Sequence, residues 1–194
     1  MCMLFKKVSL LLVILSLSAV GAQAQEIRPL VPGEPVEREI VGGQAHNYRI
    51  TLQPGQFVRV VVEQNAIDVT LVLAAPDGKQ VVEVNFTGAG GLESLSAEAA
   101  ASGDYRLTVR AAGSATLGGS YRVRLEVKAA ATEQDKQRIA AERLLDEARK
   151  SSQKRPEPVE VTVEKARQAL ALWREMGDRY WEGVTFDLIG YAYY

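Results

Sequence analysis

Cysteine and histidine are almost absent from this chain of 194 residues, which contains one of each, Cys2 and His46. One cysteine excludes an intramolecular disulfide, and a zinc site would need more His or Cys ligands than these two residues supply. A Ser-His-Asp triad would depend on His46, and the Gly-x-Ser-x-Gly motif of many serine nucleophiles does not occur. We therefore predict no catalytic residue and no cofactor, and we interpret His46 as a polar residue at the entrance of a strand.

Blocks of basic residues are also missing. The chain has 23 Lys and Arg against 24 Asp and Glu, which gives a formal net charge of −1. Proteins that bind nucleic acid usually gather Lys and Arg in a patch or a stripe. We therefore expect no nucleic-acid partner. Four arginines in the strand-rich half are interpreted as part of a solvated sheet face rather than as a strip for an anionic partner: Arg106, Arg110, Arg122 and Arg124.

A long apolar run stands at the N-terminus and has the layout of a signal peptide. Lys6 and Lys7 precede the run 8–20, and Ala22-Gln23-Ala24 has the small-x-small form that signal peptidase cleaves. The run is shorter than the roughly 20 residues of a membrane span. We predict a signal peptide over residues 1–24, export to the periplasm or the cell exterior, and no membrane association after cleavage. The alternative is an uncleaved signal that anchors the chain.

Between residues 35 and 128, apolar residues alternate with polar ones. The alternation is clearest in five runs, at residues 48–52, 58–62, 69–73, 105–109 and 121–127. One apolar and one polar face is typical of a half-buried antiparallel strand. Turn signals such as Pro54-Gly55 and Pro76-Asp77-Gly78 separate the runs. The pattern predicts an antiparallel β-sandwich of about eight short strands over residues 26–130.

Three segments of this half resemble the bacterial pre-peptidase C-terminal (PPC) domain: GGQAHNYRITLQPGQFVRVVVEQ, IDVTLVLAAPDGKQVVEV and ASGDYRLTVRAAGSATLGGSYRVRLEV. In that family a D-x-x-L-x-L-x-x-P-x-G hairpin precedes a G-x-Y-x-L-x-V strand and a closing G-x-Y-x-L strand. The corresponding residues here are 68–78, 103–109 and 119–123. The resemblance implies a β-sandwich of jelly-roll type that accompanies secreted peptidases and other extracellular modules and is not itself catalytic.

The C-terminal part has the periodicity of helices. Thr132 is a suitable N-cap, and an apolar stripe from Ala141 to Ala148 follows, so residues 131–150 are predicted to form a connecting helix. Two prolines in SSQKRPEP indicate a linker over residues 151–158. Residues 159–194 are predicted to form two further helices, the first ended by a glycine and the second capped by the aspartate that follows it.

Residues 159–194 also resemble tetratricopeptide (TPR) repeats. ARQALALWREMGDR is similar to the second helix of a repeat, and FDLIGYAY is similar to the aromatic-x2-Leu-Gly-x2-Tyr signature that opens the next one. Gly183 departs from the pattern, because glycine weakens a helix by roughly 1 kcal/mol relative to alanine. The resemblance implies a protein or peptide partner that binds through the TPR helices. It also implies seven packing positions: Ala166, Ala169, Trp173, Phe186, Ile189, Gly190 and Tyr193.

The order of these parts resembles exported bacterial proteins in which a caspase-like CHAT peptidase domain follows the repeats. The resemblance implies that this chain is the N-terminal part of such a protein. A TPR array needs about three repeats to bury its own faces. We therefore expect Tyr191, Tyr193 and Tyr194 to be covered by a helix beyond this sequence.

Two further interpretations give the sandwich a ligand. Asp68, Asp77 and Asp104 are weak candidates for calcium ligands, although Asp77 and Asp104 already belong to turns. A carbohydrate-binding sandwich with a helical stalk is the alternative function, and it requires exposed aromatic side chains on a sheet. Outward strand positions are mostly Arg, Glu and Thr. We therefore predict a non-catalytic, exported protein-interaction module.

Overall fold

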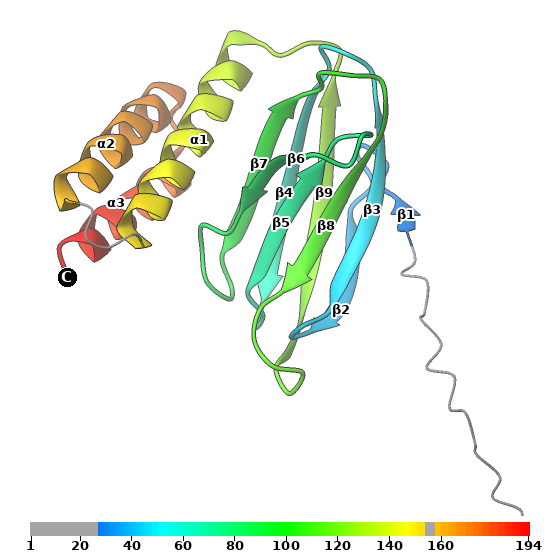
Figure 1. Ribbon diagram of the computed structural model, residues 1–194, viewed down its shortest axis with the longest axis horizontal. Helices are drawn as coiled ribbons and strands as arrows, with labels where there is room; N and C mark the ends of the chain where they lie inside the picture. Colours follow the sequence, from blue (N-terminus) through cyan, green and yellow to red (C-terminus); the bar gives the residue numbers. More distant parts are fainter. Residues whose placement is uncertain (1–26, 154–157) are drawn as a thin grey trace, which may run out of the picture.

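The computed structural model describes residues 27–153 and 158–194 of the chain. Within these ranges the chain forms nine strands and then three helices. The strands build a β-sandwich, and the helices lie together beside one edge of it (Figure 1). The predicted signal peptide, residues 1–24, falls outside the described residues. None of the helices in the described ranges combines the length and apolar character that crossing a membrane requires.

The first sheet has five strands in the order β1-β3-β8-β5-β6. Their bounds are β1 Ile27–Pro29, β3 Ala45–Leu52, β5 Val69–Ala74, β6 Gln80–Val84 and β8 Gly103–Ala111. β1 runs parallel to β3, and the other neighbours are antiparallel. β5 and β6 are joined at the predicted Pro76-Asp77-Gly78 turn, where Gly78 has a φ of 83°, a conformation that glycine adopts without strain.

The second sheet has four antiparallel strands in the order β2-β9-β4-β7. Their bounds are β2 Val36–Val41, β4 Phe57–Asn65, β7 Leu92–Glu98 and β9 Gly118–Lys128. From β2 to β9, every consecutive pair of strands except β5 and β6 changes sheet. This is the strand order of a jelly roll, so the predicted antiparallel sandwich is confirmed, with one more strand than the sequence pattern indicated.

The inward residues of the five runs that the period-two pattern predicted lie in the core of the sandwich, together with residues outside those runs such as Ile40, Val84 and Leu95. Val60 and Leu107, from opposite sheets, are fully buried, as are most of their inward neighbours. Outward charges pair across strands, as in the contact of Arg122 Nη2 with Glu37 Oε2 at 3.2 Å and of Arg110 Nη2 with Glu83 Oε1 at 3.1 Å. The apolar face therefore closes the core while the polar face is solvated.

His46 lies on β3, as predicted for a polar residue of a strand. Its Nδ1 atom is 2.8 Å from the hydroxyl of Tyr121 on β9, and that hydroxyl is 2.6 Å from the hydroxyl of Tyr48. Burial raises the pKa of Tyr121 above its usual range, and the Tyr48 bond adds to this effect. These three side chains connect the two sheets through hydrogen bonds.

The three helices are α1 Glu133–Gln153, α2 Val159–Met176 and α3 Arg179–Ala192. Thr132 and Asp135 cap α1 reciprocally: the Asp135 N–H donates to Thr132 Oγ1 at 3.2 Å, and the Thr132 N–H donates to Asp135 Oδ2 at 2.9 Å. Gly177 ends α2 with a φ of 69°, and the Asp178 side chain accepts the N–H of Trp181 at the start of α3. The predicted helix ends at residues 177 and 178 are therefore confirmed.

The segment at residues 131–150 is more than a connecting helix. α1 continues to Gln153, so the first residues of the predicted linker 151–158 are helical, and residues 154–157 fall outside the described part. α1 packs against α2 and also against β7 of the sandwich. Ala141 and Leu145 of α1, Ala169 and Trp173 of α2, and Trp181 of α3 form one buried apolar cluster. The stripe that the sequence showed on α1 is thus the inner face of a helical layer.

Candidate binding groove between the sandwich and the helices

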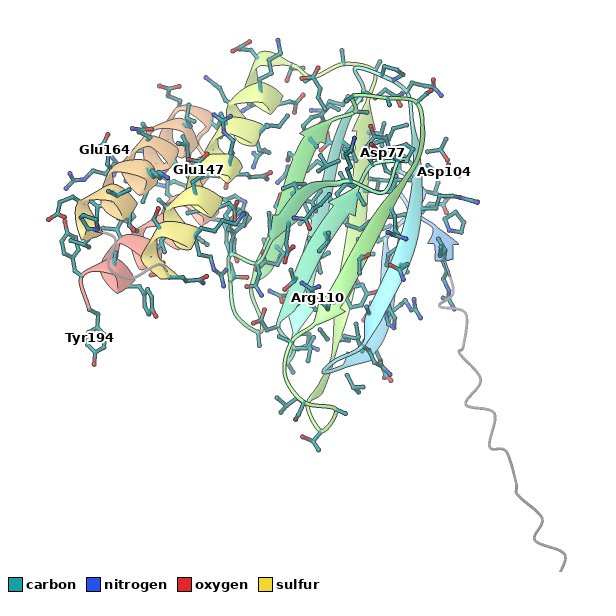
Figure 2. All side chains as sticks on the ribbon, viewed as in Figure 1. Asp77, Asp104, Arg110, Glu147, Glu164 and Tyr194 are labelled. Atoms are coloured by element: carbon teal, nitrogen blue, oxygen red, sulfur yellow. The ribbon has the colours of Figure 1, made fainter. Side chains whose placement is uncertain are left out.

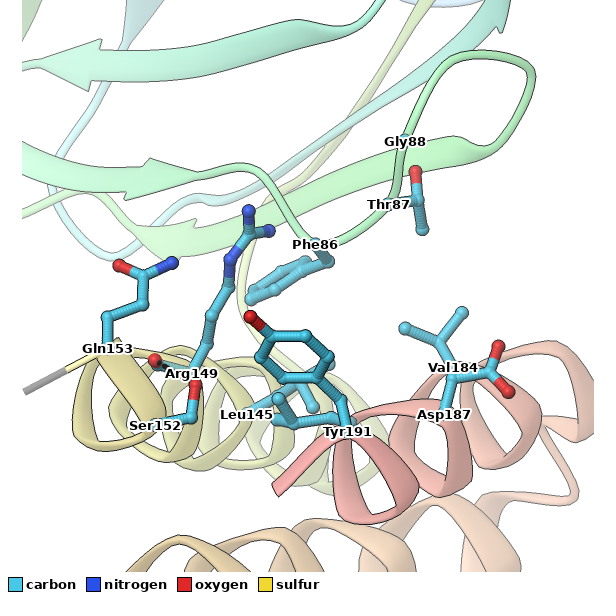
Figure 3. A pocket seen from close by; sticks show the side chains of 11 residues that line it. Phe86, Thr87, Gly88, Leu145, Arg149, Ser152, Gln153, Val184, Asp187 and Tyr191 are labelled. Carbon is cyan, nitrogen blue, oxygen red and sulfur yellow. Dashed lines mark hydrogen bonds between the residues drawn. The ribbon is translucent and has the colours of Figure 1, made fainter. Parts of the chain in front are cut away.

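A groove of about 500 Å³ lies where α1, α3 and the loop between β6 and β7 meet. Phe86 from the loop and Tyr191 from α3 point into it, and Arg149 reaches across it from α1 (Figure 3). Leu145 and Val184 supply further apolar wall. A groove of this size with a mostly apolar wall and a few polar groups is typical of a binding site.

The loop between β6 and β7 is held in place by a buried carboxylate. Glu93 on β7 accepts the N–H of Phe86 at 2.7 Å, the N–H of Thr87 at 2.6 Å and the hydroxyl of Thr87 at 2.9 Å. Burial raises the pKa of Glu93 to about 7, although these hydrogen bonds and the charge of Arg149 act in the opposite direction. The loop is therefore fixed by a group that titrates near neutral pH.

Phe86 belongs to both apolar cores of the molecule. It packs against the interior of the sandwich and against the cluster between the helices. Its ring meets that of Trp181 edge-on with the centroids 5.5 Å apart, and Trp181 stacks on Trp173 at 5.8 Å. Aromatic pairs in these geometries add to the stabilisation that burial alone provides. The loop thus anchors α3 to the sandwich through one side chain.

Two hydrogen bonds add to this anchor. The Leu92 N–H at the start of β7 donates to the hydroxyl of Tyr180 on α3 at 2.7 Å. Arg149 Nη1 on α1 donates to the side-chain oxygen of Asn85 at 3.0 Å. Hydrogen bonds therefore join the sandwich to α1 and to α3, the two helices that border the groove. These bonds hold the walls of the groove at a fixed distance.

A buried charged cluster fixes α1 on the second sheet. Glu142 is fully buried, and its Oε1 accepts the hydroxyls of Ser94 and Ser96 on β7 at 2.9 and 3.2 Å. Its Oε2 has no hydrogen-bond partner in the part of the chain that the structure describes. Burial raises the pKa of Glu142, and the positive charges of Arg59 and Arg138 counteract that rise. A buried carboxylate with one unpaired oxygen is costly, which makes this joint sensitive to substitution.

The groove has polar residues in its wall, among them Ser152 and Asp187. Its lining contains no His or Cys among the described residues. The hydroxyl of Ser152 donates to the main-chain oxygen of Arg149 at 2.7 Å, an ordinary bond within a helix.

The three calcium candidates are not brought together. Asp68 precedes β5 and Asp77 follows it, so a six-residue strand, roughly 20 Å long, separates them. Asp68 accepts from Asn85, Asp77 from the N–H of Lys79, and Asp104 from the hydroxyl of Thr51. Asp77 and Asp104 lie at the same end of the sandwich (Figure 2). Within residues 27–153 and 158–194, no three His, Cys, Asp or Glu side chains form a group that could hold a metal ion.

The seven predicted packing positions divide into two sets. Ala166, Ala169 and Trp173 are fully buried on α2. On α3, however, Phe186 is 48% exposed and Tyr193 is 66% exposed, and a Cβ atom built on Gly190 would meet nothing within 4 Å. Ile189 is half-buried. On the face of α3 that carries Phe186, Gly190 and Tyr193, the Arg174 guanidinium of α2 lies 5.5 Å from the centroid of the Phe186 ring, and much of the face stays exposed.

Sequence reasoning missed the residues that join the two parts. The sequence pattern did not distinguish Glu93 and Glu142 from other acidic residues, and Phe86 lies in a loop between strands. The available signal was the strand 92–98, in which Glu93, Leu95 and Ala97 alternate with Ser94 and Ser96. That alternation places a carboxylate on the inward face of β7, an arrangement that requires buried partners.

The comparisons with known proteins give no family. No family model and no curated protein matches the sequence. Among solved structures, the periplasmic g-type lysozyme inhibitor PliG of Aeromonas hydrophila is 13% identical, with 53% of this chain and 96% of that chain covered and a TM-score of 0.44. The pre-peptidase C-terminal domain of a Bacillus anthracis collagenase is 16% identical, with coverages of 53% and 96% and a TM-score of 0.43. The copper-binding surface protein CorA of Methylomicrobium album BG8 is 8% identical, with coverages of 53% and 98% and a TM-score of 0.40.

Proposed function

We propose that this protein is a non-catalytic, exported binding module in which a PPC-like sandwich carries TPR-like helices that contact a protein partner. The sequence motifs at residues 68–78, 103–109 and 119–123 support the PPC-like assignment, and the jelly-roll order of the strands agrees with it. Export is supported by the signal-peptide layout of residues 1–24. Repeats and a following CHAT domain remain expectations from resemblance.

The observation that carries the proposal is the position of the exposed aromatic side chains. In the described part of the chain these are Tyr180, Phe186, Tyr191, Tyr193 and Tyr194, and all of them lie on α3 or directly after it. Exposed aromatic residues that gather on one element are typical of protein interfaces. Helix α3 is therefore the expected contact surface.

The TPR-like interpretation explains why α3 presents such a face. α2 packs against both α1 and α3, whereas α1 and α3 hardly touch, an arrangement that fits successive helices of a repeat array. In such an array a further helix would cover Phe186, Gly190 and Tyr193. A chain that carries two further repeats should accordingly show slower amide exchange over residues 178–194.

The carbohydrate-binding alternative is less well supported. It requires aromatic platforms on a sheet, and none of the exposed aromatic side chains in residues 27–153 and 158–194 belongs to a strand. The outward face of β8 carries Arg106 and Arg110, which are charged rather than aromatic.

A photo-crosslinking experiment in the exporting cell tests the proposal. A benzophenone amino acid is placed at Tyr191 or Tyr193 on the α3 side, and as a control at Arg106, which is exposed on β8. We expect discrete protein adducts from the two α3 positions and none from the control. Absence of adducts at α3, or equal adducts at Arg106, would contradict a partner surface on α3.

A further inference from the structure

The outer face of the second sheet holds a trough that is separate from the groove at the helices. Its volume is about 390 Å³, and loop 33–35, before β2, forms one of its walls. The loop is attached to β9, since the Gly33 N–H donates to the Leu125 carbonyl at 3.2 Å. Val61 on β4 and Leu92 on β7 supply apolar lining. The trough is therefore a preformed concavity with an apolar portion.

The cations on this sheet face are mostly paired. Arg122 pairs with Glu37, Arg124 with Glu63, and Lys128 with both Glu126 and Asp135. Arg124 and Glu126 line the trough, but each has a partner of opposite charge. Because each of these cations already has an acidic partner, none of them offers an unpaired positive charge to a ligand.

Arg59 differs from these cations. It lines the trough and is partly buried, and no ion pair of its guanidinium occurs among the described residues. Its hydrogen bond to another side chain runs from Nε to the hydroxyl of Ser94 at 3.5 Å, which is long for such a bond. Burial, and then the charge of Arg138, lowers the pKa of Arg59. A guanidinium has five N–H donors, so most of its donor capacity is open to a ligand.

Glu142, Glu126 and Asp178 act on the charge of Arg59, and Glu34 also lines the trough, but none of these acids forms an ion pair with Arg59 among the described residues. Glu126 is opposite Arg59 in the β4–β9 register, but its carboxylate contacts Lys128 Nζ at 3.2 Å. Glu142 is fully buried under α1, and its Oε1 accepts the hydroxyls of Ser94 and Ser96. The guanidinium of Arg59 therefore has no direct carboxylate partner among the described residues, and it lines a concave site where a carboxylate ligand would form a charge-assisted, bidentate bond.

We propose that this trough binds a carboxylate that carries a short apolar group, with Arg59 binding the carboxylate and Val61 and Leu92 contacting the apolar group. The C-terminal residue of a peptide and a small branched organic acid share this chemistry. The site lies on the sandwich and is independent of the partner surface on α3, so either proposal stands without the other.

The test is an NMR titration of the full chain with matched probes. N-acetyl-leucine carries the free carboxylate, and N-acetyl-leucinamide is its neutral counterpart. We expect N-acetyl-leucine to shift the amide signals of Val61 and Leu92 and to bind at least about tenfold more tightly than the amide, because only the acid forms the charged bond. Equal binding of the two probes, or no shifts at these residues, would overturn the proposal.

Substitutions of single arginines test whether Arg59 supplies the positive charge that binds the carboxylate. Arg59→Gln should weaken N-acetyl-leucine binding by about tenfold, whereas Arg122→Gln, which removes a paired arginine outside the trough, should leave it unchanged. If Arg59→Gln does not fold, Arg59→Lys keeps the charge without the planar fork and should bind several-fold more weakly. Full binding by a folded Arg59 variant would also refute the role of Arg59.

Two further probes separate the sources of the carboxylate. The tripeptide Ala-Ala-Leu with a free C-terminus and 4-methylpentanoate carry the same acid and the same branched group. Tighter binding of the tripeptide supports a peptide C-terminus as the ligand, and equal binding supports a small organic acid. Failure of both to bind wild-type protein would reject the site.

Discussion

The sandwich and the helical layer bury their apolar residues to different degrees. In the sandwich, two sheets face each other, and inward residues such as Val60, Leu71 and Leu107 are completely buried. In the helical layer, α2 packs between α1 and α3, whereas α3 packs against α2 and the loop between β6 and β7 and presents Phe186 and Tyr193 to solvent. The sandwich is thus a closed core, whereas the helices end in an open face. The closed core belongs to the sandwich, and the open face of α3 is the surface that we propose contacts a partner.

The two parts also differ in how they are joined. Within each part the contacts are apolar, but the joint between them combines Phe86 with the buried acids Glu93 and Glu142. Buried acids hold a position through hydrogen bonds, and their contribution to stability depends on pH. The joint should therefore respond to pH more strongly than either core does.

Of the changes predicted here, Trp173→Ala should lower the free energy of unfolding most. It should destabilise the helices while the sandwich stays folded. Trp173 is fully buried between the helices and stacks on Trp181, so its truncation should cost about 3–5 kcal/mol. We expect faster amide exchange throughout α1, α2 and α3, while β3, β4 and β8 stay protected. Equal loss of protection in the strands would show that the two parts unfold as a single unit.

Glu93 should make the stability of the joint between the sandwich and the helices depend on pH. Its pKa is raised from 4.5 to about 7 in the folded protein, so the folded state binds the proton more tightly than the unfolded state. Its stabilising contribution is therefore complete below about pH 4.5 and is lost as the pH rises through about 7, by up to about 3 kcal/mol in the free energy of unfolding. Urea unfolding at pH 5 and pH 8 measures this difference.

Glu93→Gln is the matched variant for that measurement. Glutamine cannot titrate, so the variant should lose the share of the pH dependence that belongs to Glu93, even if the loss of acceptor oxygens lowers its stability at every pH. Asp77→Asn serves as a control at an exposed turn. If the free energy of unfolding of Glu93→Gln changes between pH 5 and pH 8 as much as that of the wild-type protein, the pH dependence does not come from Glu93.

Phe186→Ala should hardly change stability. Phe186 is 48% exposed and contacts the Arg174 guanidinium at 5.5 Å from its ring centroid, so its truncation should change the free energy of unfolding by no more than about 0.5 kcal/mol. Leu145→Ala, at a buried site of the same layer, should cost about 2–5 kcal/mol. Similar losses in these two variants would mean that α3 is covered in solution.

Removal of divalent cations should change stability least. Asp68, Asp77 and Asp104 have separate partners, so a chelator should not shift the melting midpoint of a fragment that ends after residue 130. Such a fragment should melt cooperatively, because the two sheets form their own core. A large drop in the midpoint with chelator would instead support the calcium interpretation.

The sequence alone determined the local features of this protein. Period two identified five of the nine strands in the described residues and their inward side chains, because neighbouring side chains on a strand point to opposite faces. Thr132, Gly177 and Asp178 marked helix ends, because capping depends on residues next to each other in the chain. The predicted sandwich and helices follow from such short-range rules.

The tertiary structure decided which elements meet and which charges are buried. α1 was predicted as a connection, yet it lies on β7, where Glu142 bonds serines that are far from it in sequence. Phe86 joins two cores from a loop that has no periodic signal, and Glu93 fixes that loop. Burying a carboxylate is favourable only where distant donors converge on it, and that convergence is a property of the folded chain rather than of any local segment.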